Sequence, residues 1–191
     1  MRGLLALGLQ FALQFALQFA RAIDALNEAI GRGVKWLVLI ATLVSAVNAS
    51  LRYGFDLSSN AWLELQWYLF ALIFLLGAGY TLKHNGHVRI DVIYGRLSTR
   101  AQAWIDLFGS LLFLLPVTGL MAWMGWSVFS ESWAIQEHSP DSGGLLRWPV
   151  KLALPIGFGL LFLQGISEIF KRIGMLAGQL PFTREAAEEV V

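Results

Sequence analysis

Four long apolar runs dominate the pattern of hydrophobic and polar positions along this chain. The runs cover residues 34–51, 62–82, 103–129 and 152–170, and polar segments separate them. A helix needs about 20 predominantly apolar residues to cross the hydrocarbon core of a bilayer. The pattern therefore predicts four transmembrane helices. We expect the third to be tilted or kinked, because Pro116 lies near its middle and frees a backbone carbonyl that neighbouring groups must satisfy.

The overall composition also indicates a membrane protein. Of the 191 residues, 57% are hydrophobic and 14% are charged, whereas about a quarter are charged in a soluble domain. The 14 Lys and Arg residues nearly balance the 13 Asp and Glu residues, so no extended basic surface is offered to nucleic acid. The chain has no cysteine, which excludes disulfides, thiolate zinc sites and iron–sulfur clusters. The predicted fold class is an all-α integral membrane protein.

The distribution of cations predicts the orientation, because loops rich in Lys and Arg stay in the cytoplasm. Most of the cations lie before the first run, between the second and third, or after the fourth. Only Arg52, Arg147 and Lys151 lie in the other two connections. Both termini are therefore predicted to be cytoplasmic. Aromatic residues near the ends of the runs, such as Trp62 and Trp104, fit anchors at the two membrane boundaries.

The segment "KHNGHVRID", residues 83–91, groups two histidines, two basic residues and an aspartate. A metal site is a poor interpretation, because Asn-Gly between the two histidines favours a turn and His138 falls on the opposite side of the predicted membrane. The apolar residues of "HVRIDVIYGRL" alternate with charged ones, which predicts an amphipathic interfacial helix between the second and third spans. The candidate residues of this inner-interface loop are His87, Arg89, Asp91, Arg96 and Arg100.

Polar residues inside the apolar runs are the other candidates, because such groups are costly in a membrane. Glu64 lies near the outer boundary on a face with Tyr68, and Asp106 could pair with an arginine of the preceding loop. The fourth run carries a stripe of Ala153, Gly157, Gln164 and Glu168 that suits contact with another helix. The candidate residues for packing between helices or subunits are Glu64, Tyr68, Asn48, Asp106, Gln164 and Glu168. We expect no catalytic, cofactor or metal residue in this chain.

The first 33 residues form a separate amphipathic segment in this interpretation, followed by a membrane domain over 34–172 and a cytoplasmic tail over 173–191. The repeat "LQFALQFALQFA", residues 9–20, is too rich in glutamine for a fifth span and favours an interfacial helix on the inner leaflet. A cleaved signal peptide is the alternative, because "ARA" at 20–22 resembles a cleavage site.

Several motifs in order resemble those of the small membrane subunit of tripartite ATP-independent periplasmic (TRAP) transporters. They are "WLELQWYLF" around Glu64, "GHVRIDV" after the second run, and "RWPVK" with "LPIGFGLL" at the start of the fourth. The resemblance covers about residues 21–175 and is closest to the larger type of this subunit. It implies a non-enzymatic scaffold in the bacterial inner membrane. Its implied partners are a large elevator-type subunit, which would hold the sodium, and a periplasmic protein that captures organic acid anions.

Two other functional classes stay open at this point. A small proton-coupled exporter that works as a homodimer would use Glu64 as its carrier, although a carrier carboxylate is expected deeper in the membrane. A non-transport membrane anchor or assembly protein also fits the composition. Under the family interpretation, the second outer loop is a candidate docking surface for the periplasmic protein, and a plain connection is its alternative. The candidate docking residues are Glu137, Asp141, Arg147 and Trp148.

Overall fold

The computed structural model describes residues 2–57, 59–87 and 94–181 of the chain, with side chains described from residue 11 onward. Every named element in this part is helical, and four helices are long and apolar enough to cross a membrane, as the sequence predicted. The elements are α1 (Arg2–Phe55), α2 (Asn60–Lys83), α4 (Thr99–Gly109), the π-helical turn η1 (Ser110–Leu114), α5 (Leu115–Ala134) and α6 (Trp148–Leu176). α4, η1 and α5 follow one another without a break and together form the third apolar helix.

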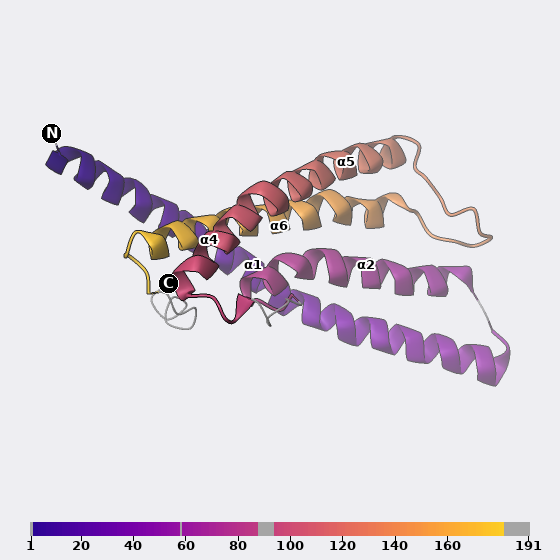
Figure 1. Ribbon diagram of the computed structural model, residues 1–191. Coiled ribbons are helices and arrows are strands. Elements are labelled where there is room, and N and C mark those ends of the chain that lie inside the picture. Colours follow the sequence, from indigo (N-terminus) through magenta and orange to yellow (C-terminus); the bar gives the residue numbers. More distant parts are fainter. Residues whose placement is uncertain (1, 58, 88–93, 182–191) are drawn as a thin grey trace.

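Helix α6 is the centre of the bundle. It packs against α1, α2, α4 and α5, and it runs beside α5 on one side and beside the α1–α2 pair on the other (Figure 1). Its stripe of small residues permits this close packing. A methyl group added at Gly157 would lie 2.7 Å from the Leu75 carbonyl oxygen of α2, and one added at Gly125 of α5 would lie 3.1 Å from the Pro155 nitrogen of α6. Close approach of backbones is a common way for helices to associate in lipid.

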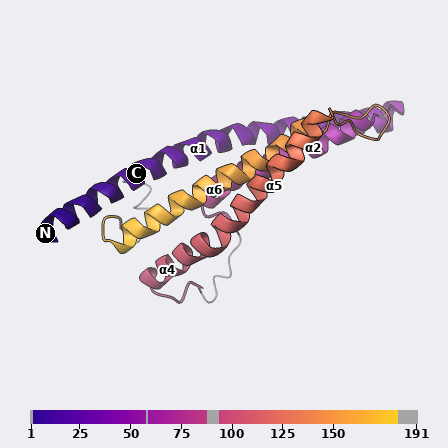
Figure 2. The same cartoon turned by 90° about the horizontal axis from the view of Figure 1, so that it is seen from above.

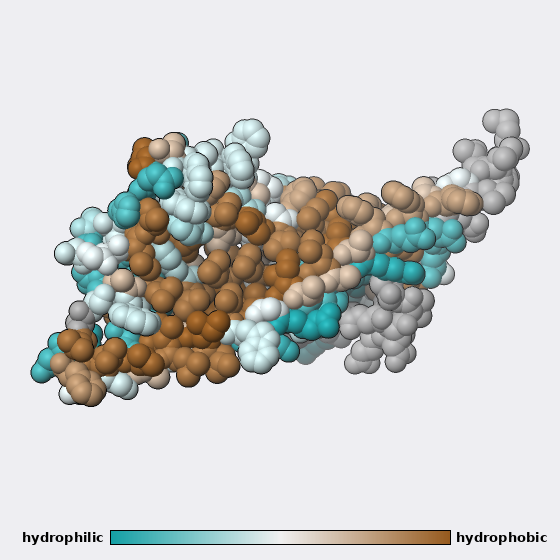
Figure 3. Space-filling view, turned by 180° about the vertical axis from the view of Figure 1, so that it is seen from behind, coloured by the Kyte–Doolittle hydropathy of each residue, from teal (hydrophilic) through white to brown (hydrophobic). Residues whose placement is uncertain are grey.

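The outside of the bundle is covered by large apolar side chains, including Phe74 and Trp123, each 77% exposed. Figure 3 shows this as a broad hydrophobic surface over the middle of one face, with hydrophilic residues gathered toward its two ends. A contiguous apolar surface of this extent is suited to contact with lipid.

Pro116 distorts the third apolar helix, as its position predicted. Proline has no backbone N–H and its ring crowds the carbonyl four residues earlier. The π-helical turn η1 ends two residues before Pro116, and the Thr118 hydroxyl donates a hydrogen bond to the Leu114 carbonyl at 2.6 Å. Figure 2 shows that α4 and α5 run in different directions on either side of this turn.

Helix α1 continues unbroken across the predicted boundary at residue 33. It has 54 residues and is therefore about 80 Å long at 1.5 Å per residue. Its N-terminal part extends past the other helices (Figure 1). Here Leu17 packs against Met175 and Leu180 near the end of α6, so this part of α1 is joined to the bundle.

The surface of α1 between residues 11 and 26 divides lengthwise into three faces at about 100° per residue. One face is buried against α6. The exposed remainder has an apolar stripe of Phe11, Phe15, Phe19 and Leu26 beside a polar stripe of Gln14, Gln18 and Arg21. Division of an exposed surface in this way is typical of a helix at a membrane interface. The interfacial position of this segment stays a prediction.

Spin labels at two neighbouring positions test that prediction. Because the chain has no cysteine, Phe15→Cys and Gln18→Cys each give a single labelling site in nanodiscs. We expect the label at position 15 to be relaxed mainly by oxygen, which dissolves in lipid, and the label at position 18 by a water-soluble nickel complex. Phe74→Cys on the apolar surface is the lipid control. Equal exposure of both positions to nickel would show instead that the segment projects into water.

Candidate functional site: polar clusters at the two ends of the bundle

A buried polar network joins α1 to α6 at the end of the bundle where α4 begins. Gln164 on α6 is fully buried and lies at its centre. Its side-chain amide donates to Asp24 Oδ1 at 2.7 Å, and its carbonyl oxygen accepts from Asn27 Nδ2 at 2.9 Å. The Ser167 hydroxyl donates to the same Asp24 oxygen at 2.8 Å. These buried hydrogen bonds fix the register of α1 against α6.

Two cations of α6 extend this network to α4. Lys171 Nζ lies 3.0 Å from Asp24 Oδ2 and 2.7 Å from Glu168 Oε1. Arg172 lies 2.9 Å from Asp106 Oδ2 and 4.0 Å from Glu168 Oε2. These side chains are at most 14% exposed. Burial of unpaired charge is costly, so each ionised group here has an oppositely charged partner. The name inner network is used below for Asp24, Asn27, Asp106, Gln164, Ser167, Glu168, Lys171 and Arg172.

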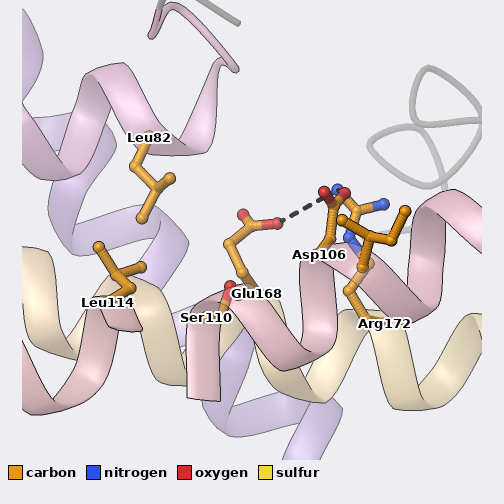
Figure 4. A pocket seen from close by; sticks show the side chains of 8 residues that line it. Leu82, Asp106, Ser110, Leu114, Glu168 and Arg172 are labelled. Carbon is orange, nitrogen blue, oxygen red and sulfur yellow. Dashed lines mark ion pairs between the residues drawn. The ribbon is translucent and has the colours of Figure 1, made fainter. Parts of the chain in front are cut away.

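A pocket of about 260 Å³ opens beside the inner network, between α2, α4, η1 and α6. Figure 4 shows Asp106, Glu168 and Arg172 on its wall, with the Arg172 side chain beside the Asp106 carboxylate and Arg172 also 4.0 Å from Glu168 Oε2. The carboxylates thus share a cation of the chain itself. Among the described residues no three His, Asp or Glu side chains are grouped so as to hold a metal ion.

The end of α2 nearest the inner network is tied to α1 by a smaller cluster. Glu28 Oε2 lies 2.9 Å from both Lys83 Nζ and His84 Nε2. Lys83 and His84 begin the segment "KHNGHVRID", and here both bind Glu28 of α1, Lys83 as an ion pair and His84 by a hydrogen bond. His87, Arg96 and Arg100 of the same loop are exposed. The other two predicted loop residues, Arg89 and Asp91, lie outside the described residues.

At the opposite end, Glu64 holds the loop of residues 135–147, named the outer loop below. Glu64 is only 5% exposed. Its Oε2 accepts from the Leu145 backbone N–H at 2.6 Å, and its Oε1 accepts from the Ser139 hydroxyl. Asn60, one turn earlier on α2, donates to the Ser142 carbonyl at 3.0 Å. The carboxylate thus holds the outer loop against α2, and a role of Glu64 in packing between helices or subunits stays a prediction.

The outer loop is itself folded as a short antiparallel turn. The Ser139 N–H donates to the Leu145 carbonyl at 3.0 Å, and the Arg147 N–H donates to the Glu137 carbonyl at 2.8 Å. Gly143 reverses the chain at a φ of +73°, a conformation that glycine adopts without strain. The loop is therefore an ordered element with a defined tip.

The predicted docking residues divide between the base and the tip of this turn. A hydrogen bond from Lys151 lowers the pKa of Glu137 below its ordinary value, with smaller contributions that include the charge of Arg147. Trp148 stacks edge-on against Trp133 with ring centroids 4.4 Å apart. Asp141 is exposed at the tip. Asp141 thus places its charge at the tip of the turn, while Glu137 and Arg147 pair 3.9 Å apart at the base.

The structure separates the predicted packing residues into those that join helices and those that do not. Gln164, Glu168 and Asp106 meet in the inner network, where the described arginine partner of Asp106 is Arg172 on α6. Asn48 is buried on α1, one turn after Ser45, whose hydroxyl donates to Gln66 of α2 at 3.0 Å. Tyr68 is half-buried, and its hydroxyl has no hydrogen-bond partner among the described residues.

Sequence reasoning missed several members of both clusters. Asp24, Asn27 and Lys171 lie outside the predicted spans, and Ser139 lies in a loop. A usable signal existed for the first two, because Ala20, Ile23, Asp24 and Asn27 share one face of a helix. That signal shows a buried face but does not identify α6 as the partner.

The fold and its two polar ends define a multi-pass helical membrane protein. The chain belongs to the family of tripartite ATP-independent periplasmic transporters, DctQ component, whose family model matches residues 41–174. The resemblance found in the sequence motifs is thereby confirmed. The N-terminal part of α1 precedes the matched residues.

Two relatives are similar to this chain at low identity. The C4-dicarboxylate TRAP transporter small permease protein DctQ of Pseudomonas aeruginosa is 30% identical over 112 residues, which are 55% of this chain and 50% of that protein. A putative TRAP transporter small permease protein of Haemophilus influenzae is 25% identical over 148 residues, which are 76% of this chain and 90% of that protein. The match to the Pseudomonas protein thus spans half of its length.

Removal of the central cation tests whether the inner network stabilises the fold. Lys171→Met leaves Asp24 and Glu168 buried with fewer cationic partners, and we expect the free energy of unfolding to fall by about 3–5 kcal/mol. Unfolding in mixed micelles, followed by circular dichroism, measures it. Lys35→Met, at an exposed position of α1, is the matched control and should change little. Equal stability of the two variants would show that the network does not hold the helices together.

Proposed function

We propose that this chain is the small scaffold subunit of a sodium-coupled tripartite transporter that imports organic acid anions. Its partners in this proposal are a large elevator-type membrane subunit, which holds sodium and substrate, and a periplasmic substrate-binding protein. The family assignment supports a transporter subunit. The name of the Pseudomonas relative refers to C4-dicarboxylates, which supports the class of organic acid anions for this system.

The observation that carries the proposal is the absence of ionisable side chains from the middle of every apolar helix. Residues 36–51, 65–82, 107–130 and 152–167 contain no Asp, Glu, Lys, Arg or His. Transport sites for ions and charged substrates commonly lie near the bilayer midplane and use polar or charged groups and interrupted helices. Charges here gather at the two ends of the bundle. This arrangement favours a structural subunit over one that carries an ion across the membrane.

The inner network gives a physical reason for a static role. An elevator mechanism needs one element that moves and one that stays in place. Lys171 of α6 pairs with Asp24 of α1, and Arg172 of α6 pairs with Asp106 of α4. Sliding of α1 or α4 along α6 would therefore break buried ion pairs. Breaking such a pair costs about 3–5 kcal/mol. This cost favours a bundle that keeps a single arrangement while a partner moves.

The placement of cations supports the orientation with both termini in the cytoplasm. The end of α2, the start of α4 and the end of α6 lie at one end of the bundle, and the outer loop lies at the other (Figure 1). Lys83, Arg100 and Lys171 belong to the first group of segments, whereas Arg147 and Lys151 belong to the outer loop and the start of α6. The positive-inside rule then favours a cytoplasmic side for the inner network. The outer loop would face the periplasm.

The position of Glu64 weakens the alternative of a proton-coupled exporter. A carrier carboxylate must exchange protons with both sides of the membrane. Glu64 instead lies in the second turn of α2, with both carboxylate oxygens bound to the outer loop. A non-transport anchor does not account for the family assignment.

Reconstitution tests the proposed function. We expect uptake of radiolabelled succinate into proteoliposomes under an inward sodium gradient only when this chain, the large subunit and the binding protein of the same system are all present. Glu64→Gln should retain most of the uptake, because a glutamine carbonyl and amide can replace both bonds to the outer loop. Proton-driven transport by this chain alone, or complete loss of uptake in Glu64→Gln, would contradict the scaffold role.

Docking of the binding protein at the tip of the outer loop makes a separate prediction. Asp141→Lys reverses the exposed charge without disturbing the pairs at the base of the loop. We expect a higher concentration of binding protein to be needed for half-maximal uptake, with the increase shrinking at high salt because exposed charges are screened. Asp56→Asn, an exposed acid in the other outer connection, is the control. If Asp141→Lys needs the same half-maximal concentration of binding protein as the wild type at every salt concentration, electrostatic docking at this tip is ruled out.

A further inference from the structure

Glu64 is the one buried carboxylate at the outer end among the described residues, and the function proposed above does not use it. Its carboxylate is 75 and 81 residues away in sequence from the two groups that it binds, Ser139 and the Leu145 N–H. These two groups lie on the two sides of the turn in the outer loop. One carboxylate therefore bridges both strands of the turn to α2.

The surroundings of Glu64 are shaped to fit this contact. Gly144 lies against it, and a methyl group added there would lie 2.9 Å from Glu64 Oε1 and would also meet the Ser139 side chain. The Ser139 hydroxyl in turn accepts from the Asp141 N–H at 3.2 Å, which links the carboxylate to the tip. Asn60 adds a second contact from α2 to the Ser142 carbonyl. The tip is thus fixed relative to α2 through a continuous set of hydrogen bonds.

We infer that Glu64 is a positioning residue that keeps the outer loop in one conformation for docking of the periplasmic binding protein. The identity of the docking partner rests on the proposed function, whereas the ordering of the outer loop by Glu64 does not. A loop that is ordered before docking loses less conformational entropy when it binds. Loss of the carboxylate should therefore weaken docking without slowing the transport step that follows.

Two substitutions remove the contact from opposite sides. Glu64→Leu removes both acceptors and leaves the Leu145 N–H without a partner, whereas Gly144→Ala pushes the loop away from an intact carboxylate. Glu64→Gln is the conservative variant that should restore the contact. Gly159→Ala on α6, where an added methyl group meets nothing within 4 Å, is the matched glycine control.

The first measurement concerns the chain alone. A nitroxide on Ser142→Cys, at the exposed tip, reports loop motion in nanodiscs. We expect restricted motion with Glu64 or Gln at position 64, and fast motion in Glu64→Leu and Gly144→Ala. Unchanged motion in both of these variants overturns the inference, whether or not the protein acts in transport.

The second measurement separates docking from transport. In proteoliposomes with all three components, Glu64→Leu should raise the half-saturating concentration of binding protein about tenfold, which corresponds to about 1.4 kcal/mol, with a maximal uptake rate within about twofold of the wild type. A reduced maximal rate at an unchanged half-saturating concentration overturns the positioning role. Absence of uptake in the wild-type system would refute the proposed function, and the label motion would still decide the structural part.

Discussion

The cost of burying charge away from water constrains this structure more than any other interaction. Apolar side chains contribute little specificity in a membrane, because lipid tails are as apolar as leucine. Polar groups that leave water must instead find defined partners. Gln164 satisfies this requirement by donating to Asp24 and accepting from Asn27. Lys171 and Arg172 then neutralise the acids of three helices. The relative positions of α1, α4 and α6 depend on these pairs.

Small residues also hold the helices together, by letting their backbones pack closely. Along α6, Ala153 and Gly157 are buried in the stretch 152–167, which contains no Asp, Glu, Lys, Arg or His. Here the backbones themselves come close, and dispersion contacts replace hydrogen bonds as the source of attraction. Many large aromatic side chains, such as Phe74 and Trp123, are exposed on the outside of the bundle. The bundle is thus held by polar pairs at its inner end and by close packing along its middle.

The sequence predicted the local features well and the long-range ones poorly. Apolar runs predicted the four helices, and Pro116 predicted the distortion that appears as η1. These features depend on neighbouring residues. The partner of Asp24 lies 140 residues away at Gln164, and helical periodicity shows which face is buried but not what covers it. The bonds of Glu64 to Ser139 and Leu145 could not be predicted for the same reason, because these partners lie 75 and 81 residues away in a polar loop.

The two ends of the bundle use carboxylates in physically different ways. At the inner end the acids pair with Lys171 and Arg172, and these contacts join helix to helix. At the outer end Glu64 binds a hydroxyl and a backbone N–H, and these contacts join a helix to a turn. One carboxylate carries both side-chain contacts from Glu64 to the loop, whereas several acids and cations share the contacts of the inner network. The proposed scaffold role, with a soluble partner that binds and leaves, is compatible with this asymmetry. The inner network keeps the helices in one arrangement, and Glu64 keeps the outer loop ordered through contacts that are separate from that network.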